Sequence, residues 1–568
     1  MPKKATSPKK ATSLKKATSL KKATSRKKAT SRKKATSPKK ATSSKKATSP
    51  KKATSRAAAR PRRTSQTTRP RGSVPREKLP RSAPPVRFES QKHIEGVRAA
   101  LKRADYIRGV AASTKAHPRP LAADVQETHP LIRMFFYGLA ISEDDARPAL
   151  EPLALEDWAG GNLIALKGGR AVPLVRIEPY SGLLVATDIE WSSPQKAAPD
   201  AVMGLTGSSM WLANLTIRRR SRLTLDLGTG GGIQAMLASS HSERVIAVDA
   251  NARALDFARF NAQLNGISNI EFIEGEWFEP VEGAKFDLIV SNPPFVISPD
   301  FQILCRDNPM DGDDLIQSLV RAMPGYLNDG GYGQIFGDWA QLTGELWAGH
   351  PAKWIAQNGC DAWVLRGKVK DAADYAKYYI GDLDKAEFAK ANRKWLAYLE
   401  RHRIERVVDG MITLRRSTGR SNWFRADEFP RRLRSGVGTA IERGFRYRDF
   451  LERTDDKLLL DEHIRASPHL RVEARLEPNA TGWDLKRAQL ILTEGLSYSA
   501  RIDAALARAV LRCGQKRCVR DLLNDVASTR GQNANDLAPG FLASVRQLIA
   551  KGMLWPVSLD EPDHAVGH

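Results

Sequence analysis

Cysteine is scarce in this sequence of 568 residues, with four copies at Cys305, Cys360, Cys513 and Cys518. Such scattered cysteines exclude a disulfide framework and a paired Cys-x-x-Cys zinc site. Long hydrophobic runs are also missing, since no stretch approaches the roughly 18 apolar residues that a membrane span needs. We therefore expect a cytoplasmic protein of a reducing compartment, with no metal and no membrane partner.

Acidic residues are almost absent from residues 1–87, where Glu77 stands alone among 19 Lys and 11 Arg. The whole chain has a formal net charge of +28, so the remaining 481 residues carry −1. The pentapeptide KKATS recurs nine times at a six-residue period from Lys3 to Ser55, without an aromatic residue. This composition cannot bury enough apolar surface to offset the entropy of ordering, so residues 1–87 are expected to be disordered.

The repeat contains three Ser-Pro-Lys-Lys sequences, which begin at Ser7, Ser37 and Ser49. They resemble the repeats of linker-histone tails that lie along the DNA minor groove, and similar Lys-Ala tails occur on bacterial nucleoid proteins. A flexible polycation releases condensed counterions from nucleic acid, which gives salt-sensitive affinity without sequence preference. We expect the tail to bind RNA or DNA non-specifically, near the nucleoid or the ribosome. A solvated linker or a targeting peptide is the alternative.

From Phe88 onward the composition becomes that of a folded protein. Residues 88–200 mix helical and strand-like patterns, and we expect an α+β accessory domain there. Residues 201–416 alternate strand and helix patterns, as a doubly wound, Rossmann-like α/β sheet does. Residues 417–568 are expected to form a helix-rich C-terminal domain, in which residues 496–557 have the order of a winged helix.

Seven strands are expected within the doubly wound sheet, because buried parallel strands read as apolar runs. They are Arg222–Leu227, Arg244–Val248, Ile270–Ile273, Phe286–Ser291, Tyr332–Phe336, Ala362–Leu365 and Met411–Leu414. Helices are expected over Ile233–Ser240 and Ala252–Asn265.

A glycine-rich turn follows the first strand and reads Asp226, Leu227, Gly228, Thr229, Gly230, Gly231, Gly232. Glycines let the chain turn sharply and let a ligand approach the backbone where a helix begins. Asp249 ends the next strand, where a carboxylate can accept hydrogen bonds from ribose hydroxyls. The Gly-x-Gly-x-x-Gly frame of dinucleotide sites fails here, because Ile233 stands where the third glycine belongs.

An acid that ends the first strand and precedes Gly-x-Gly-x-Gly resembles motif I of class I S-adenosylmethionine-dependent methyltransferases. The resemblance implies S-adenosylmethionine as the methyl donor, with the turn Asp226–Gly232 at its methionine and ribose end. Asp249 would hold the ribose, and Glu276, after the third strand, would lie near the adenine edge. The alternative for Asp249 is an N-cap of the helix Ala252–Asn265.

The fourth strand runs directly into Asn292, Pro293, Pro294 and Phe295. Two prolines fix the backbone and remove two N–H donors, so that nearby carbonyl groups point outward. The carboxamide oxygen of Asn292 and an adjacent carbonyl are paired acceptors for a planar NH2 group, and Phe295 can stack on the system that carries the amine. By itself, a double proline after a strand is only a loop. The sequence nevertheless matches the (N/D)-PP-(F/Y/W) motif of amino-group methyltransferases.

Together the motifs resemble the small-domain group, which includes ribosomal RNA guanine-N2, tRNA adenine-N6 and release-factor glutamine methyltransferases. Residues from about 90 to 560 resemble bacterial multidomain members with N- and C-terminal extensions. The shared features are Asn292–Pro299, Arg306-Asp307, Gly312-Asp313 and the strand start at Cys360. The lysine repeat lies outside this resemblance.

Three functions are compatible with these motifs. The first is an N-methyltransferase that acts by direct displacement on a nucleobase amine in RNA or DNA, which the basic tail and Phe295 favour. The second is a protein glutamine-N5 methyltransferase, because glutamine offers the same planar amide. The third is a nucleoid-binding protein with a degenerate domain, against which the intact Asp226 and Asn292 argue. The loop Val296–Gly312 is expected either to cover the substrate or to be an ordinary surface loop.

Overall fold

The computed structural model describes residues 86–87, 90–116, 125–189, 198–430, 434–514 and 517–559. The chain divides into two units, Met1–Thr67 and Thr68–His568, and every described residue lies in the second. The expected disordered tail, apart from Val86 and Arg87, lies outside the described residues. Within the described ranges, no helix is long and apolar enough to cross a membrane. The same ranges hold no cluster of three or more His, Cys, Asp or Glu side chains suited to a metal ion.

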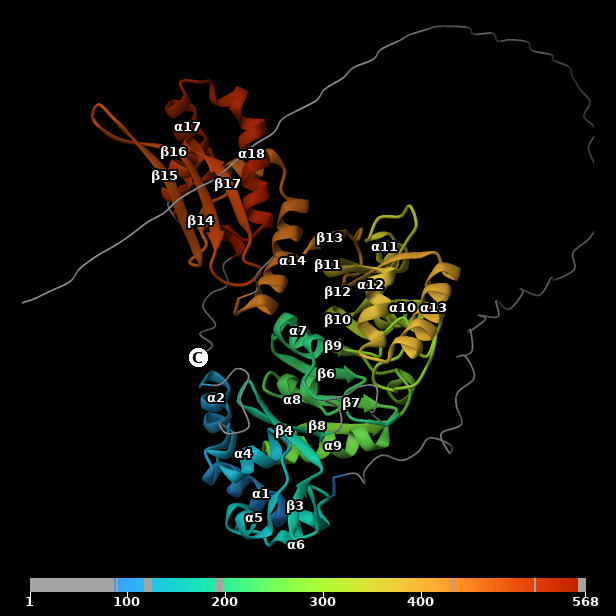
Figure 1. Ribbon diagram of the computed structural model, residues 1–568. Helices are drawn as coiled ribbons and strands as arrows, with labels where there is room; N and C mark the ends of the chain where they lie inside the picture. The colour runs from blue at the N-terminus through green and yellow to red at the C-terminus, as the bar shows by residue number, and fades with distance from the viewer. Residues whose placement is uncertain are drawn as a thin grey trace, which may run out of the picture. The chain divides into compact units, whose positions relative to one another are not determined.

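A large, mostly parallel sheet confirms the expected α/β fold (Figure 1). Its strand order is β13-β11-β12-β10-β9-β6-β7-β8, with β12 antiparallel to both of its neighbours. The strands are β6 (Ser221–Leu227), β7 (Ser242–Asp249), β8 (Ile270–Glu274), β9 (Phe286–Ser291), β10 (Leu327–Leu342), β11 (Cys360–Asp371), β12 (Ile404–Arg416) and β13 (Phe424–Glu428). All seven expected strands are present, and β13 adds an unexpected edge strand beyond residue 416.

Helices cover both faces of this sheet because its central strands are apolar on both sides. On one face, Ile289 and Ile335 share a core with α10 (Asp314–Ala322) and α11 (Gly349–Ile355). On the other face, Leu288 and Phe336 share a core with two further helices. These are α7 (Gly207–Leu215) and α14 (Val437–Arg453). The remaining helices of this region are α8 (Ile233–Ser239), α9 (Ala252–Leu264), α12 (Ala372–Ile380) and α13 (Lys385–Arg401).

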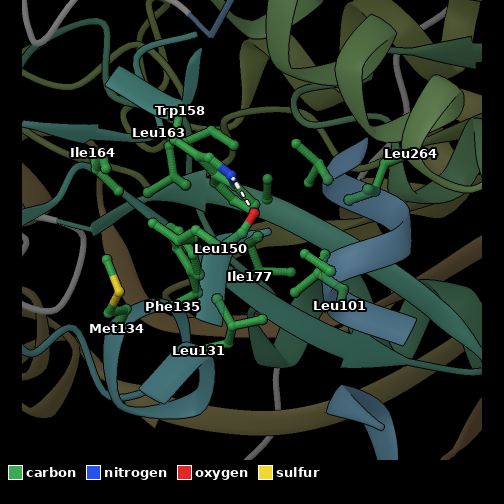
Figure 2. Close-up of a cluster of buried hydrophobic side chains, with 14 of the residues drawn as sticks. Leu101, Leu131, Met134, Phe135, Leu150, Trp158, Leu163, Ile164, Ile177 and Leu264 are labelled. Carbon is green, nitrogen blue, oxygen red and sulfur yellow. Dashed lines mark hydrogen bonds between the residues drawn. The ribbon is translucent and has the colours of Figure 1, made fainter. Parts of the chain in front are cut away.

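The N-terminal region has the expected mixture of helices and strands. Its helices are α1 (Gln91–Arg103), α2 (Tyr106–Ala116), α4 (Pro130–Phe135), α5 (Glu143–Leu150) and α6 (Leu155–Gly160). Its strands are β1 (Ile141–Ser142), β2 (Ile164–Lys167), β3 (Arg170–Pro173) and the hairpin of β4 (Val175–Tyr180) with β5 (Leu183–Asp188). Figure 2 shows its core, where the indole N–H of Trp158 donates to the carbonyl of Leu150 at 3.0 Å. Leu264 of α9 belongs to the same core, so this region packs directly on a helix of the large sheet.

Asn261 of α9 and Asn265, the C-cap residue of this helix, pair with the backbone of β5. The Asn261 amide accepts from the N–H of Ala186 at 2.8 Å and donates to its carbonyl at 3.0 Å. Asn265 forms the same pair of bonds with Leu184, at 2.9 and 2.7 Å. Asn261 also donates to the carbonyl of Gly231 at 2.9 Å. Side chains four residues apart on one helix face therefore satisfy the strand's backbone and join it to the glycine-rich turn.

Replacing Asn261 by leucine is expected to lower the free energy of unfolding by about 2 kcal/mol, because fully buried backbone groups of Ala186 lose their partners. Urea unfolding of the full chain measures this loss. Gln263→Ala, at an exposed position of the same helix, is the matched control and should leave the free energy of unfolding unchanged. Equal stability of the two variants would contradict the role of Asn261.

The C-terminal region contains the expected helices and also a small sheet. The helices are α15 (Asp456–Asp461), α16 (Ala504–Leu511), α17 (Val519–Arg530) and α18 (Ala534–Ala550). The unexpected strands β15 (Leu470–Asn479), β16 (Gly482–Leu492) and β17 (Ser499–Asp503) form an antiparallel sheet. A further short strand, β18 (Leu554–Pro556), follows α18 and pairs with β14 (Ile464–Ala466).

Candidate active site

The chain order of the strands reverses between β6 and β9, so the carboxyl ends of these two strands form a topological switch point of the sheet. Leu227, at the end of β6, pairs with Val248 on one side and with Ser291 on the other, so the strand ends are level. Ligands of open α/β sheets bind at such a switch point. The expected donor-binding turn follows β6, and the expected acceptor motif follows β9, so both lie at this switch point.

Asp226 is 1% exposed and organises the turn that follows β6. Its Oδ2 accepts from the hydroxyl of Thr229 at 2.6 Å and from the backbone N–H of Ala235 at 2.8 Å. Its Oδ1 is buried without a hydrogen-bond partner. Burial raises the pKa of Asp226 to about 7. The carboxylate thus holds the turn with one oxygen and leaves the other without a hydrogen-bond partner.

The glycines of the turn differ in the space around the position that a Cβ atom would occupy. Gly228 and Gly230 have φ angles of 74° and 55°, and a Cβ at either would meet no atom within 4 Å. A Cβ at Gly232 would lie 3.0 Å from the Cβ of Ala258 in α9. The first two glycines therefore leave open space beside the backbone, whereas Gly232 allows α8 to approach α9.

Asp249 ends β7 and reaches across to the same turn. Its Oδ2 accepts from the N–H of Gly230 at 2.8 Å, and its Oδ1 accepts from the N–H of Asn251 at 2.8 Å. Burial raises its pKa above the ordinary value, against the effect of these N–H groups. The N-cap of α9 is Asn251, so the alternative assignment of Asp249 as that cap is wrong. Glu276 lies exposed, two residues after β8.

Asn292 directly follows β9, and its amide is held in one orientation. Its Nδ2 donates to the hydroxyl of Ser209 in α7 at 3.3 Å, while its Oδ1 is buried without a partner. The ring of Phe295 meets Phe336 edge-on at 6.2 Å. The site thus contains a carboxamide oxygen without a partner, three residues before an aromatic side chain. Sequence reasoning missed Ser209, which no motif signals.

The segment from Val296 to Gly312 is folded on itself. Val296 bridges to Asp307, and Asp307, 0% exposed, accepts from the N–H groups of Gln302 and Ile303 at 2.9 and 3.0 Å. Arg306 pairs with the same carboxylate at 2.7 Å. A buried acid at its centre therefore fixes the shape of this loop.

Asp226 and Asp338, the latter on β10, both have a pKa that burial raises to about 7. Unfolded aspartate has a pKa of about 3.9. Between about pH 4 and pH 7 the folded protein therefore keeps protons that the unfolded chain has lost, so the free energy of unfolding falls as pH rises. When urea unfolding is measured at pH 5 and at pH 7.5, the free energies of unfolding at the two pH values should differ less in Asp226→Asn than in the wild type. If Asp226→Asn and Asp338→Asn both kept the pH dependence of the wild-type free energy of unfolding, its assignment to these two carboxyl groups would be contradicted.

Comparisons with known proteins point to one chemistry. The family described as Methyltransferase small domain matches residues 205–335, and a domain of unknown function, DUF7782, matches residues 442–556. A release factor glutamine methyltransferase of Xylella fastidiosa (strain 9a5c) is 37% identical over 20% of this chain and 45% of its own length. A Methanocaldococcus jannaschii protein, provisionally named a protein N5-glutamine methyltransferase, is 34% identical over 26% of this chain and 77% of its own.

The likeness is confined to part of each relative. The chain spans 39% to 48% of the length of three release factor glutamine methyltransferases from Xylella fastidiosa and Aliivibrio fischeri. Among solved structures, Trm5b from Pyrococcus abyssi aligns at 16% identity with a TM-score of 0.26, over 44% of this chain and 62% of its own.

Proposed function

The chain belongs to the small-domain group of class I S-adenosylmethionine-dependent methyltransferases, and on that premise we propose that it methylates the planar NH2 group of a macromolecule. The buried, unpartnered Oδ1 of Asn292 carries this proposal. A buried acceptor without a partner is costly, and an incoming amine hydrogen would satisfy it.

The residues beside the glycine turn fit S-adenosylmethionine, which supplies a methyl group on a sulfonium. Asp226, with its unpartnered oxygen, and the turn that contains Gly228, Thr229, Gly230 and Gly232 would hold its methionine and ribose end. The carboxylate of Asp249 would accept from the ribose hydroxyls. Glu276 would lie at the adenine edge.

The acceptor side would work mainly by orientation. The Oδ1 of Asn292 and the carbonyl of Pro293 would accept the two amine hydrogens, so that the nitrogen lone pair faces the methyl group. Pro294 would keep that carbonyl in place, and Phe295 would stack on the plane that carries the amine. The bound donor would supply the methyl carbon, the electron pair of its carbon–sulfur bond would stay on the sulfur, and the methylated nitrogen would release one proton to water. Positioning of this kind supplies most of the rate.

The first acceptor that we propose is a nucleobase amine in RNA, or in DNA. The basic sequence of residues 1–87 supports it by concentrating the enzyme on nucleic acid. The second is a glutamine side chain of a protein, which the names of the relatives support. Asn292 serves both acceptors equally, because each presents a planar NH2 group.

Transfer of tritium from labelled S-adenosylmethionine to fractionated RNA, DNA and protein separates these acceptors. The full chain is assayed beside Asn292→Ala as the matched inactive control. Label in RNA or DNA supports the first acceptor, and label in N5-methylglutamine after enzymatic digestion of the protein supports the second. Absence of label from every fraction would overturn the proposed activity.

Deleting residues 1–87 is expected to remove salt-dependent retention on a DNA column, because the rest of the chain carries a formal charge of −1. Retention is measured as the salt concentration that elutes each form. The turnover of a short acceptor should stay unchanged, since the proposed site lies elsewhere in the sequence. Equal elution of the full and shortened chains would show that the basic segment does not bind nucleic acid.

A further inference from the structure

The helices α12 and α13 form a hairpin between the neighbouring strands β11 and β12. Their buried side chains share one core with the beginning of the loop 296–312 and with Phe295. This core contains Val296, Ile297, Tyr375, Ala376, Ile380, Trp395, Tyr398 and Leu399. The hairpin therefore packs on the segment that directly follows the proposed acceptor motif.

Tyr375 of α12 joins the start of this loop to the sheet. Its hydroxyl accepts from the N–H of Ile297 at 3.0 Å and donates to Oδ2 of Asp338 at 2.8 Å. The ring is 0% exposed. Burial raises the pKa of Tyr375 well above its ordinary value, so the hydroxyl keeps the proton that it donates. One hydroxyl thus ties a residue two positions after Phe295 to a buried carboxylate of β10.

The helix α13 holds the rest of the loop in the same way. The hydroxyl of Tyr398 accepts from the N–H of Gly312 at 2.8 Å, at the far end of the loop. His402 lies 3.6 Å from the carboxylate of Asp311, and Lys394 pairs with Asp300. Two tyrosine hydroxyls from one hairpin therefore bind the two ends of the loop, and a lysine binds a residue between them.

The opposite side of the loop is bound to the segment that leads into α7. The N–H of Leu304 donates to the carbonyl of Pro199 at 3.0 Å, and the thiol of Cys305 donates to the carbonyl of Ala201 at 3.4 Å. Burial, and then the nearby Asp249 carboxylate, raise the pKa of Cys305 to about 12. The loop thus extends from the acceptor motif to the neighbourhood of the proposed ribose-binding acid.

We propose that the α12–α13 hairpin is a clamp that holds the loop 296–312 over the methyl-transfer site, with Tyr375 and Tyr398 as positioning residues. This role rests on the proposed function of Asn292 and Phe295. A loop released at either end would let the Phe295 ring and the Pro293 carbonyl drift, and small misplacements of reacting groups are costly in rate.

Tyr375→Phe and Tyr398→Phe test the clamp because each removes one hydroxyl and keeps the ring. Amide hydrogen exchange of residues 296–312 should become about tenfold faster in each variant, as loss of one buried hydrogen bond implies. The kcat should fall about tenfold, while KM for S-adenosylmethionine stays unchanged. Tyr378→Phe, which removes the same atom at a side chain 65% exposed on α12, is the matched control and should behave as wild type.

Lys394→Ala is a surface variant that does not disturb the core, and it should speed exchange near Asp300 without lowering the melting temperature. Exchange is measured on the protein alone and needs no acceptor. Faster loop exchange without methyl transfer to any fraction would support the clamp and overturn the proposed function. Methyl transfer with unchanged loop exchange in both tyrosine variants would support the proposed function and overturn the clamp.

Discussion

Asn292→Ala is expected to lower kcat for methyl transfer by about 10²-fold or more while the Kd for S-adenosylmethionine stays unchanged. The carboxamide oxygen is the buried acceptor that would orient the amine, and it contributes nothing to the turn after β6. Its amide is anchored through Ser209 of α7, and its oxygen is buried without a hydrogen-bond partner in the protein. Single-turnover assays with the labelled donor measure kcat, and titration calorimetry measures the Kd.

Two companion variants separate orientation from simple loss of packing. Asn292→Asp keeps an acceptor oxygen at the same place and should retain more activity than the alanine variant. Ser209→Ala removes the anchor of the amide and should lower kcat less than Asn292→Ala does. Full turnover by Asn292→Ala would end the proposed role of this residue, whatever the acceptor.

Asp249→Ala is expected to weaken binding of S-adenosylmethionine by about 2 kcal/mol, which is roughly a 30-fold rise in Kd. The variant removes the proposed acceptor of the ribose hydroxyls. It also releases the N–H of Gly230, which Asp249 now holds at 2.8 Å, so the open backbone of the turn loses its fixed shape. Titration calorimetry on the full chain measures this change.

The matched control for Asp249→Ala is Glu271→Ala, at an exposed acid of the neighbouring strand β8. It should bind the donor as wild type does, since Glu271 pairs with Arg244 on the surface. Asp249→Asn keeps one acceptor oxygen, so its affinity for S-adenosylmethionine should lie between those of Asp249→Ala and Glu271→Ala. Wild-type affinity in Asp249→Ala would refute the ribose contact.

The central sheet was predictable because its signals are local. The strand Phe286–Ser291 contains the apolar run Leu288-Ile289-Val290 and packs on both faces, as a buried parallel strand must. The edge strand β13 was not predictable, since Phe424–Glu428 is polar and its residues are partly or fully exposed. The small sheet of β15, β16 and β17 was missed for the same reason: most of its residues are exposed.

In the candidate site, too, the residues that lie in local motifs were predictable, and those brought together only by folding were not. Asp226, Asp249 and Asn292 each follow or end a strand in a recognisable motif, so their shared edge of the sheet could be deduced from order alone. Ser209 lies 83 residues from Asn292, and Tyr375 lies 78 residues from Ile297. A tyrosine on an apolar helix face reads as ordinary core, and its partner appears only when the chain has folded.

The helix α9 gives the N-terminal region and the glycine turn a common mechanical support. Phe257, Phe260 and Leu264 pack into the N-terminal core. Asn261 forms hydrogen bonds with the backbone of both β5 and Gly231. A fragment that begins at residue 201 would expose these apolar side chains to solvent. It would also leave the side-chain amides of Asn261 and Asn265 without their partners in β5, so we expect it to aggregate rather than fold. A macromolecule bound by the N-terminal region would be held, through α9, in a fixed position relative to the proposed methyl-transfer site. Its binding would in turn affect the conformation of the glycine-rich turn that we propose binds the donor.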